Sequence, residues 1–199
     1  MKLNKQYKTI FGDFQTPLEL AREVTALAVA TNGNFSAVVE PTCGVGSFLV
    51  ASIEQIGSAI SYYGFDINPQ YVEQCLDSTR SAGMEVRIEC RDFYEMEWKT
   101  FFQELPAGVL IIGNPPWVTN AALGSMGANN LPAKTNFQGH SGFAAKTGKA
   151  NFDISEWMLI RLLESLSGKQ ATLAMLCKTA TARKVLRHAW RSKLDLGRS

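Results

Sequence analysis

The stretch Gly108–Trp117 (GVLIIGNPPW) combines a short apolar run with a rigid loop rich in hydrogen-bond acceptors. Its apolar and β-branched residues predict a buried strand, and the Gly and Pro residues predict an abrupt end. Pro115 and Pro116 have fixed φ angles and no N–H group, so the loop carbonyls form a stiff row of acceptors. Asn114 adds a side-chain acceptor and Trp117 a flat apolar face. This set suits a planar ring with an amino group, above all adenine, although an Asn-Pro turn alone explains it too.

A second candidate site follows the apolar run at residues 37–40. Gly44 and Gly46 allow a ligand to approach the backbone closely, and Asp66 follows at the distance expected of a ribose-binding acid. The dinucleotide-binding pattern is incomplete, because Leu49 replaces its third glycine and Glu40 closes the strand. A carboxylate there would repel a pyrophosphate but attract a cation. S-adenosyl-L-methionine carries sulfonium and ammonium groups and meets both conditions, with Asp66 accepting from the ribose hydroxyls.

A third candidate lies in the run Arg91-Asp92-Phe93. Asp92 could accept a hydrogen bond from the adenine amine of the cofactor, and Phe93 could pack on the ring. The alternatives are solvated carboxylates at strand ends and a phenylalanine of the core. Three acids at successive strand ends favour the cofactor site over these separate explanations.

Hydrophobic periodicity predicts strands that alternate with helices. Thr16 is the expected N-cap of the first helix, with Pro17 at its first position. The alternation predicts a doubly wound α/β domain with a parallel sheet covered on both faces, whose ligands bind at the carboxyl ends of the strands. The expected strands are 37–40, 61–66, 84–89, 108–113 and 171–177, and the expected helices are 17–31, 47–56, 68–81, 98–105, 152–165 and 179–191.

Composition indicates one ordinary globular domain. The chain has 199 residues, of which 46% are hydrophobic and 19% charged, enough to bury a core. It has no apolar run of membrane-spanning length and no signal-peptide pattern at its start, so we expect a cytoplasmic protein without a membrane partner. Four scattered cysteines and two histidines predict no metal site and free, mostly buried thiols.

The charge of +2 is distributed unevenly along the chain. Residues 1–133 contain 8 Lys and Arg against 14 Asp and Glu, whereas residues 134–199 contain 12 against 4. The basic part is typical of a surface that faces a polyanion, with a solvated helix face as the alternative. The unpatterned stretch 118–150 is expected to be a substrate loop whose lysines contact phosphates. These lysines are Lys134, Lys146 and Lys149.

The runs FGDFQTP, EPTCGVGSF, GFDINP, RDFYE and NPPW together resemble the adenine-N6 DNA methyltransferases of restriction-modification systems, which have the class I, Rossmann-like fold. The resemblance covers most of the chain through residue 117. It implies methyl transfer from S-adenosylmethionine to the N6 amine of adenine in DNA. It also implies Asn114 and the Pro115 carbonyl, in the loop that includes Pro116, as amine acceptors and Trp117 as the stacking partner.

The same resemblance implies the cofactor contacts. It assigns Gln15, Thr16, Glu40, Thr42 and the loop of Gly44 and Gly46 to the methionine end, Asp66 to ribose, and Asp92 with Phe93 to adenine. The NPP-aromatic signature also occurs in enzymes that methylate adenine in RNA or glutamine in proteins. The upstream Gln-Thr-Pro segment favours DNA.

The chain also departs from this family. The motifs have the gamma order, which leaves no room for a target-recognition domain before Asn114. Family sheets have seven strands, the last two forming an antiparallel hairpin, whereas only five are predicted here. We therefore expect a single catalytic domain over 1–199, with a cofactor-contacting segment at 1–16 and without the hairpin or a target-recognition domain. Such a chain would be a fragment of a longer enzyme, would rely on a specificity subunit, or would bind the cofactor without activity.

Overall fold

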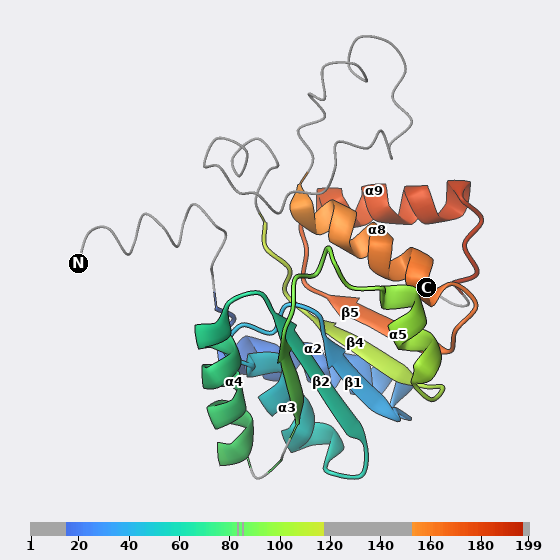
Figure 1. The fold of residues 1–199 in the computed structure, drawn as a ribbon. Helices are drawn as coiled ribbons and strands as arrows, with labels where there is room; N and C mark the ends of the chain where they lie inside the picture. Colours follow the sequence, from blue (N-terminus) through green and yellow to red (C-terminus); the bar gives the residue numbers. More distant parts are fainter. Residues whose placement is uncertain (1–14, 83, 85, 118–152, 197–199) are drawn as a thin grey trace, which may run out of the picture.

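The computed structural model describes residues 15–82, 84, 86–117 and 153–196. Its central element is a parallel sheet of five strands in the order β3-β2-β1-β4-β5 (Figure 1). The strands are β1 (Ala37–Glu40), β2 (Ser61–Asp66), β3 (Arg87–Cys90), β4 (Val109–Gly113) and β5 (Ala171–Met175). The central strands β1 and β4 are buried along their whole length, as expected of strands covered on both faces. The predicted α/β fold with five parallel strands is confirmed.

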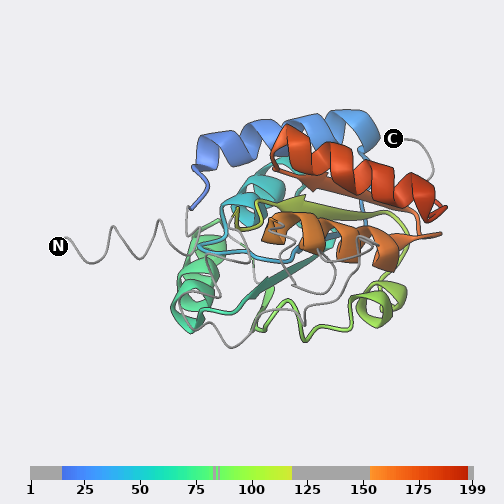
Figure 2. The same ribbon diagram turned by 90° about the horizontal axis from the view of Figure 1, so that it is seen from above.

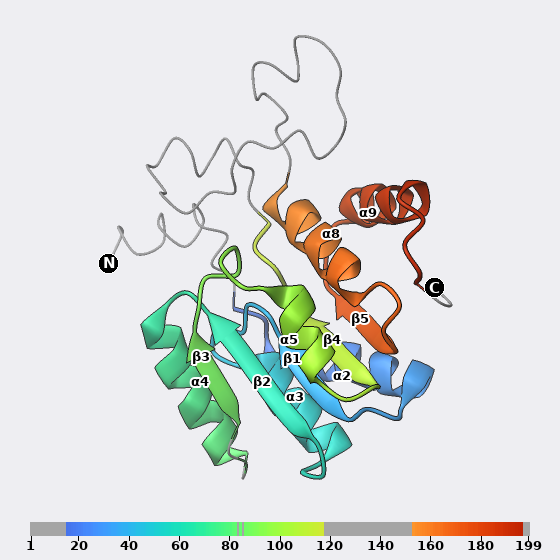
Figure 3. The same ribbon diagram turned by 45° about the vertical axis from the view of Figure 1, so that its right-hand side comes forward.

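Helices cover both faces of the sheet (Figure 2). One face carries α2 (Leu18–Asn32), α3 (Ser47–Ile56) and α4 (Pro69–Ser81), and the other carries α5 (Trp98–Glu104) and α8 (Ile154–Leu166). The last helix, α9 (Thr179–Arg191), packs against α8 (Figure 3). Successive side chains along a strand point to opposite faces of the sheet, so the sheet divides the core into two parts. Val38 faces α2 and α3, whereas Val39 faces α5 and α8.

Several element boundaries follow from local chemistry. The side chain of Asn68 accepts a hydrogen bond from Gln70 N at 3.0 Å, and Pro69 occupies the first turn, so α4 begins as predicted. Asp153 caps α8 in the same way by accepting from Ser155 N at 3.1 Å. The helix therefore begins at Ile154, two residues after its predicted start at residue 152.

Several predictions about boundaries were wrong. The fifth strand ends at Met175, two residues before its predicted end. The third strand begins at Arg87 instead of residue 84, because the backbone N–H of Met84 donates to the carbonyl of Thr79 at the end of α4. Thr16 is not the N-cap of the first helix either. Pro17 holds that position with extended angles, the helix begins at Leu18, and no side chain caps it.

Candidate active site

The carboxyl ends of the parallel strands bring the predicted residues to one edge of the sheet. Glu40 ends β1, Asp66 ends β2 and Asn114 directly follows β4, which pairs with β1. The close approach of these ends is visible at Gly113, where an added Cβ would lie 3.5 Å from Glu40 Cγ. The acceptor loop therefore begins beside the carboxylate that closes β1.

The loop between β1 and α3 wraps tightly around its glycines. Gly44 and Gly46 have φ angles of 51° and 87°, in the left-handed region that favours glycine. The backbone N–H of Gly46 donates to the carbonyl of Cys43 at 2.8 Å and closes the turn. A Cβ at Gly46 would lie 2.5 Å from Cys75 Sγ on α4, so this position has no room for a side chain.

Asp66 connects this glycine loop to the next strand end. Its Oδ2 accepts from the backbone N–H of Gly44 and its Oδ1 from that of Asn68, both at 2.8 Å. The carboxylate thereby holds the glycine loop against the turn that leads into α4. The side chain is half-buried, so it borders the loop at the same edge of the sheet.

The segment before α2 reaches the same loop from the other side. Gln15 Oε1 accepts from the backbone N–H of Val45 at 3.0 Å, and the carbonyl of Thr16 accepts from the Ser47 hydroxyl at 2.7 Å. The structure therefore brings Gln15 and Thr16 close to the glycine loop, while their contact with the cofactor stays a prediction. The rest of the predicted segment 1–16 lies outside the described residues.

Two polar atoms at this edge are buried without a hydrogen-bond partner among the described residues, Thr42 Oγ1 and Asn114 Oδ1. A buried polar atom normally has a partner, because leaving it unpaired costs about 1–3 kcal/mol. Thr42 lies in the glycine loop and Asn114 at the start of the NPPW loop. Both atoms lie at the edge of the sheet where the sequence predicts the ligands, and their missing partners are a signal that no sequence pattern contains.

The NPPW loop changes from buried to exposed along its length. Pro115 is buried and Pro116 half-buried, whereas the Trp117 side chain is 44% exposed. Trp117 is therefore not a core tryptophan. An exposed indole face next to a rigid acceptor loop can stack on a planar ring.

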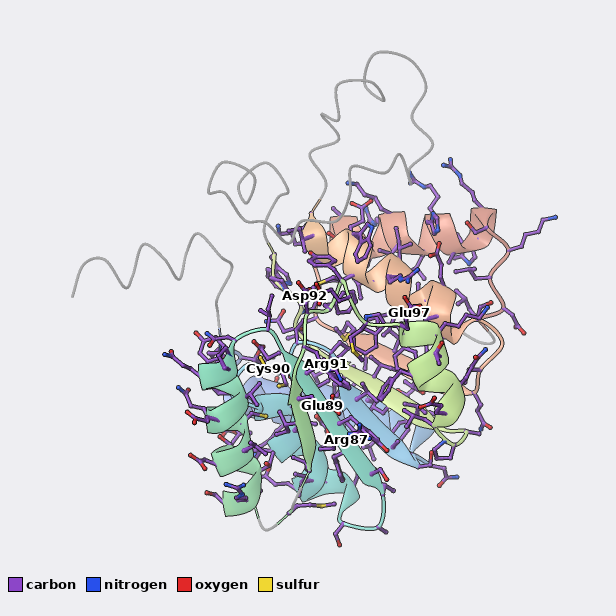
Figure 4. All side chains as sticks on the ribbon, in the orientation of Figure 1. Arg87, Glu89, Cys90, Arg91, Asp92 and Glu97 are labelled. Carbon is purple, nitrogen blue, oxygen red and sulfur yellow. The ribbon has the colours of Figure 1, made fainter. Side chains whose placement is uncertain are left out.

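Asp92 and Phe93 follow β3 and have different surroundings. Figure 4 shows Asp92 just beyond the end of β3, and its Oδ1 accepts from Tyr94 N at 2.9 Å. Phe93 is only 5% exposed and packs on Trp98 with ring centroids 4.9 Å apart. The described contacts of Phe93 are those of a core residue, so a contact with the cofactor ring stays a prediction.

Glu40 is a buried carboxyl, only 2% exposed, whose Oε2 accepts from Leu49 N at 3.3 Å. Burial raises the pKa of Glu40 well above its ordinary value of 4.5. The neighbouring Cys75 and Asp66 raise this pKa further, while the Leu49 hydrogen bond opposes the shift. A cationic ligand beside Glu40 would stabilise its carboxylate and offset the cost of burying that charge.

Replacing Glu40 with glutamine is expected to stabilise the protein more as pH rises. The folded chain binds the proton of the Glu40 carboxyl more tightly than the unfolded chain does. The contribution of Glu40 to the unfolding free energy is therefore fully present below pH 4.5, and it is lost as the pH rises towards the pKa of Glu40 in the folded protein. The Glu40→Gln and wild-type proteins should therefore differ little in unfolding free energy at about pH 5 and clearly at about pH 8. Urea unfolding at both values measures this, and a pH-independent difference would contradict it.

The remaining predictions concern cysteines and basic residues. Cys43 and Cys75 are buried, but Cys177 is half-buried and Cys90 is exposed on edge strand β3 (Figure 4), so the prediction of mostly buried thiols was only half right. In the described ranges no group of His, Cys, Asp or Glu side chains is arranged to hold a metal ion. No helix there is long and apolar enough to cross a membrane.

The basic residues of α9 and its N-cap form two groups, one that pairs with acids and one that is exposed. Lys178, Lys184 and His188 approach Asp153, Glu156 and Glu164 within 2.8–3.0 Å and so join α9 to α8 and its N-cap. Arg183, Arg187 and Arg191 are exposed and follow one another at four-residue spacing, on one side of the helix. Lys134, Lys146 and Lys149 lie outside the described residues.

Comparisons with known proteins agree on one family. The family described as N-6 DNA Methylase matches residues 2–180. The chain is 45% identical over 193 residues to the Type II methyltransferase M.NspV of Nostoc sp., covering 96% of this chain and 40% of that protein. It is 30% identical over 125 residues to the Type II methyltransferase M.VspI of Vibrio sp., covering 58% of this chain and 28% of that protein. The chain thus spans less than half the length of either relative.

A solved structure has the same fold. A proposed RNA methyltransferase of Pyrococcus horikoshii superimposes with a TM-score of 0.55 over 89% of this chain and 70% of that chain, at 12% identity. At this identity the likeness concerns the fold alone. Because the family match spans most of the residues and includes every described motif, this chain belongs to the N-6 DNA methylase family.

Proposed function

We propose that this chain contains the cofactor-binding and catalytic part of an enzyme that transfers a methyl group from S-adenosylmethionine to the N6 amine of adenine in DNA. The observation that carries the proposal is the buried, unpartnered Asn114 Oδ1 at the carboxyl edge of the sheet. It is an acceptor held ready for an N–H donor from outside the described protein. Family membership and the names of the Type II methyltransferase relatives support the same reaction.

The residues at the sheet edge fit S-adenosylmethionine. The glycine loop admits close backbone approach, Thr42 Oγ1 is a buried atom in need of a partner, and Glu40 is a buried carboxyl next to which a cation is favourable. Glu40, Thr42, Gly44, Gly46, Gln15 and Thr16 would hold the methionine end, Asp66 the ribose, and Asp92 with Phe93 the adenine. When bound, the cofactor supplies a methyl group on a positively charged sulfur.

The NPPW loop would prepare the amine for attack. The nitrogen of an adenine amine is a weak nucleophile because its lone pair is delocalised into the ring. Asn114 Oδ1 and the Pro115 carbonyl would accept its two hydrogens, draw the nitrogen towards tetrahedral geometry and stabilise the positive charge that develops on it. These two acceptors would hold the amine where a bound methyl donor could transfer its methyl group, and solvent would take the surplus proton of the amine.

The target base must leave the duplex or be single-stranded to reach this loop. The exposed indole of Trp117 would then replace part of the lost base stacking. Lys134, Lys146 and Lys149 stay our candidates for phosphate contacts. Because the chain spans 40% of M.NspV, we also propose that sequence recognition needs a further domain or a specificity subunit.

The test is transfer of labelled methyl from S-adenosylmethionine to unmethylated DNA, with RNA and protein alongside, followed by nucleoside and amino-acid analysis. We expect the label in N6-methyladenine of DNA. Label in RNA adenine or in protein glutamine would overturn the proposed substrate. Cofactor binding without any transfer would mean that the chain alone is a cofactor-binding fragment.

A further inference from the structure

The Asn114 amide has one end paired and the other end unpaired. Its Nδ2 donates to Thr16 Oγ1 at 3.2 Å, while its Oδ1 is buried without a partner among the described residues. An amide can rotate by 180° and exchange these ends, and the two orientations have opposite consequences. With Oδ1 towards the substrate, Asn114 can accept a hydrogen bond from an N–H group. With Nδ2 towards the substrate, the amide would place its own N–H donor against the N–H donor of the substrate.

The hydroxyl of Thr16 is used for this contact and not for a helix cap. Pro17 takes the N-cap position of α2, and no side chain caps the helix. Thr16 and Asn114 lie 98 residues apart in the chain, so only the fold brings them together. The sequence pattern that suggested a cap therefore marks a tertiary contact with the acceptor loop.

Thr16 is itself held from two directions. Its carbonyl accepts from the hydroxyl of Ser47, the first residue of α3, at 2.7 Å. The preceding Gln15 accepts from Val45 N in the glycine loop at 3.0 Å. On its other side α2 begins at Leu18 and packs with α3 in the same core cluster. These contacts fix the backbone of Thr16 and place its hydroxyl beside the Asn114 amide, where it accepts from Nδ2.

We propose that Thr16 is a positioning residue that holds the Asn114 amide with Oδ1 towards the substrate amine. This role rests on the proposed function, because it needs an amine to be received. It differs from the cofactor contact that the resemblance implies for Thr16, since it acts through Asn114 and not through the affinity for S-adenosylmethionine. The segment of Gln15 and Thr16 contacts both Asn114 and the residues that follow the glycines of the loop. The proposed substrate acceptor and the proposed cofactor site are therefore positioned by the same segment.

The experiment compares single-turnover transfer to DNA at saturating S-adenosylmethionine for Thr16→Val and Thr16→Ser. Valine keeps the shape but removes the acceptor, and transfer should fall by about tenfold, the factor that one net hydrogen bond can supply. Serine keeps the hydroxyl and should restore the rate to within about threefold. Thr16→Ala repeats the valine test should that variant fold poorly. Thr31→Val, an exposed position on α2, is the control and should transfer at the wild-type rate.

A double substitution separates the positioning role from a structural one. Combined with Asn114→Ala, Thr16→Val should lower transfer no further, because the amide that it orients is absent. Wild-type transfer by Thr16→Val at saturating cofactor, or the same tenfold loss in the Asn114→Ala background, would overturn the inference while leaving the proposed function intact. Wild-type transfer by Asn114→Ala itself would overturn both.

Discussion

Replacing Asn114 by alanine is expected to lower the single-turnover rate of methyl transfer by about 10²–10³-fold, the usual effect of removing one preorganised hydrogen-bonding group from a transition state. The affinity for S-adenosylmethionine should stay within about twofold, because the proposed cofactor contacts come from other residues. The reason for the large effect lies in Oδ1. It is already buried and has no hydrogen-bond partner in the described part of the chain, so its desolvation is complete before the substrate arrives.

The measurement is a rapid-quench assay at saturating cofactor, together with a calorimetric titration of S-adenosylmethionine. Asn32→Ala is the matched control, because Asn32 is an exposed residue at the end of α2 and precedes β1, away from the carboxyl edge of the sheet. It should leave both values unchanged. A normal transfer rate in Asn114→Ala would remove Asn114 from the mechanism, and equal losses of rate and cofactor affinity would make it a cofactor ligand instead.

Replacing Gly46 by alanine is expected to be the most disruptive single methyl addition at the cofactor edge. A left-handed backbone conformation alone costs alanine about 1–2 kcal/mol. At Gly46 the new Cβ would also meet Cys75 Sγ at 2.5 Å, so either the loop or α4 must move. We expect the variant to lose at least about 2 kcal/mol of unfolding free energy and to bind S-adenosylmethionine at least about tenfold more weakly.

Gly57 provides a control for a methyl group added away from the cofactor edge. It also has a positive φ, of 89°, but its ψ of −172° differs from the 21° of Gly46, and an added Cβ there meets no atom within 4 Å. Gly57→Ala should therefore lower the unfolding free energy through the backbone alone and leave cofactor affinity normal. In a Cys75→Ala background the loss of cofactor affinity caused by Gly46→Ala should shrink, because the colliding sulfur is gone. An equal loss of cofactor affinity in Gly46→Ala and Gly57→Ala would show that close packing at Gly46 is not what shapes the loop.

Much of the fold could be predicted because local patterns and tertiary structure agree. Strand 37–40 and helix 47–56 were predicted to the residue, since Pro41 ends the short apolar run and Gly46 and Gly57 flank the amphipathic run. Edge strand β3 was predicted three residues too early. An edge strand pairs on one side only, and here its start depends on where β2 provides a partner for Arg87.

The site could be predicted in its parts but not in its connections. The residue types identified Asp66 and Asn114, but not that Asp66 ties Gly44 to Asn68 or that, within the described ranges, Asn114 is paired at one end only. The contacts of Asp66 with Gly44 and of Asn114 with Thr16 join residues far apart in the chain. Thr16 illustrates the difference. The local sequence predicted a helix N-cap, whereas in the folded chain the Thr16 hydroxyl accepts from the Asn114 amide.

The most direct test of the central claim is a crystal structure of the chain with S-adenosylhomocysteine and a short single-stranded DNA that contains adenine. The account predicts the exocyclic nitrogen of adenine about 2.7–3.2 Å from Asn114 Oδ1, with the Pro115 carbonyl as the second acceptor and Trp117 against the ring. It also predicts the ribose of the cofactor at Asp66. An adenine amine bound elsewhere, or Asn114 Oδ1 paired with another group of the protein, would contradict it.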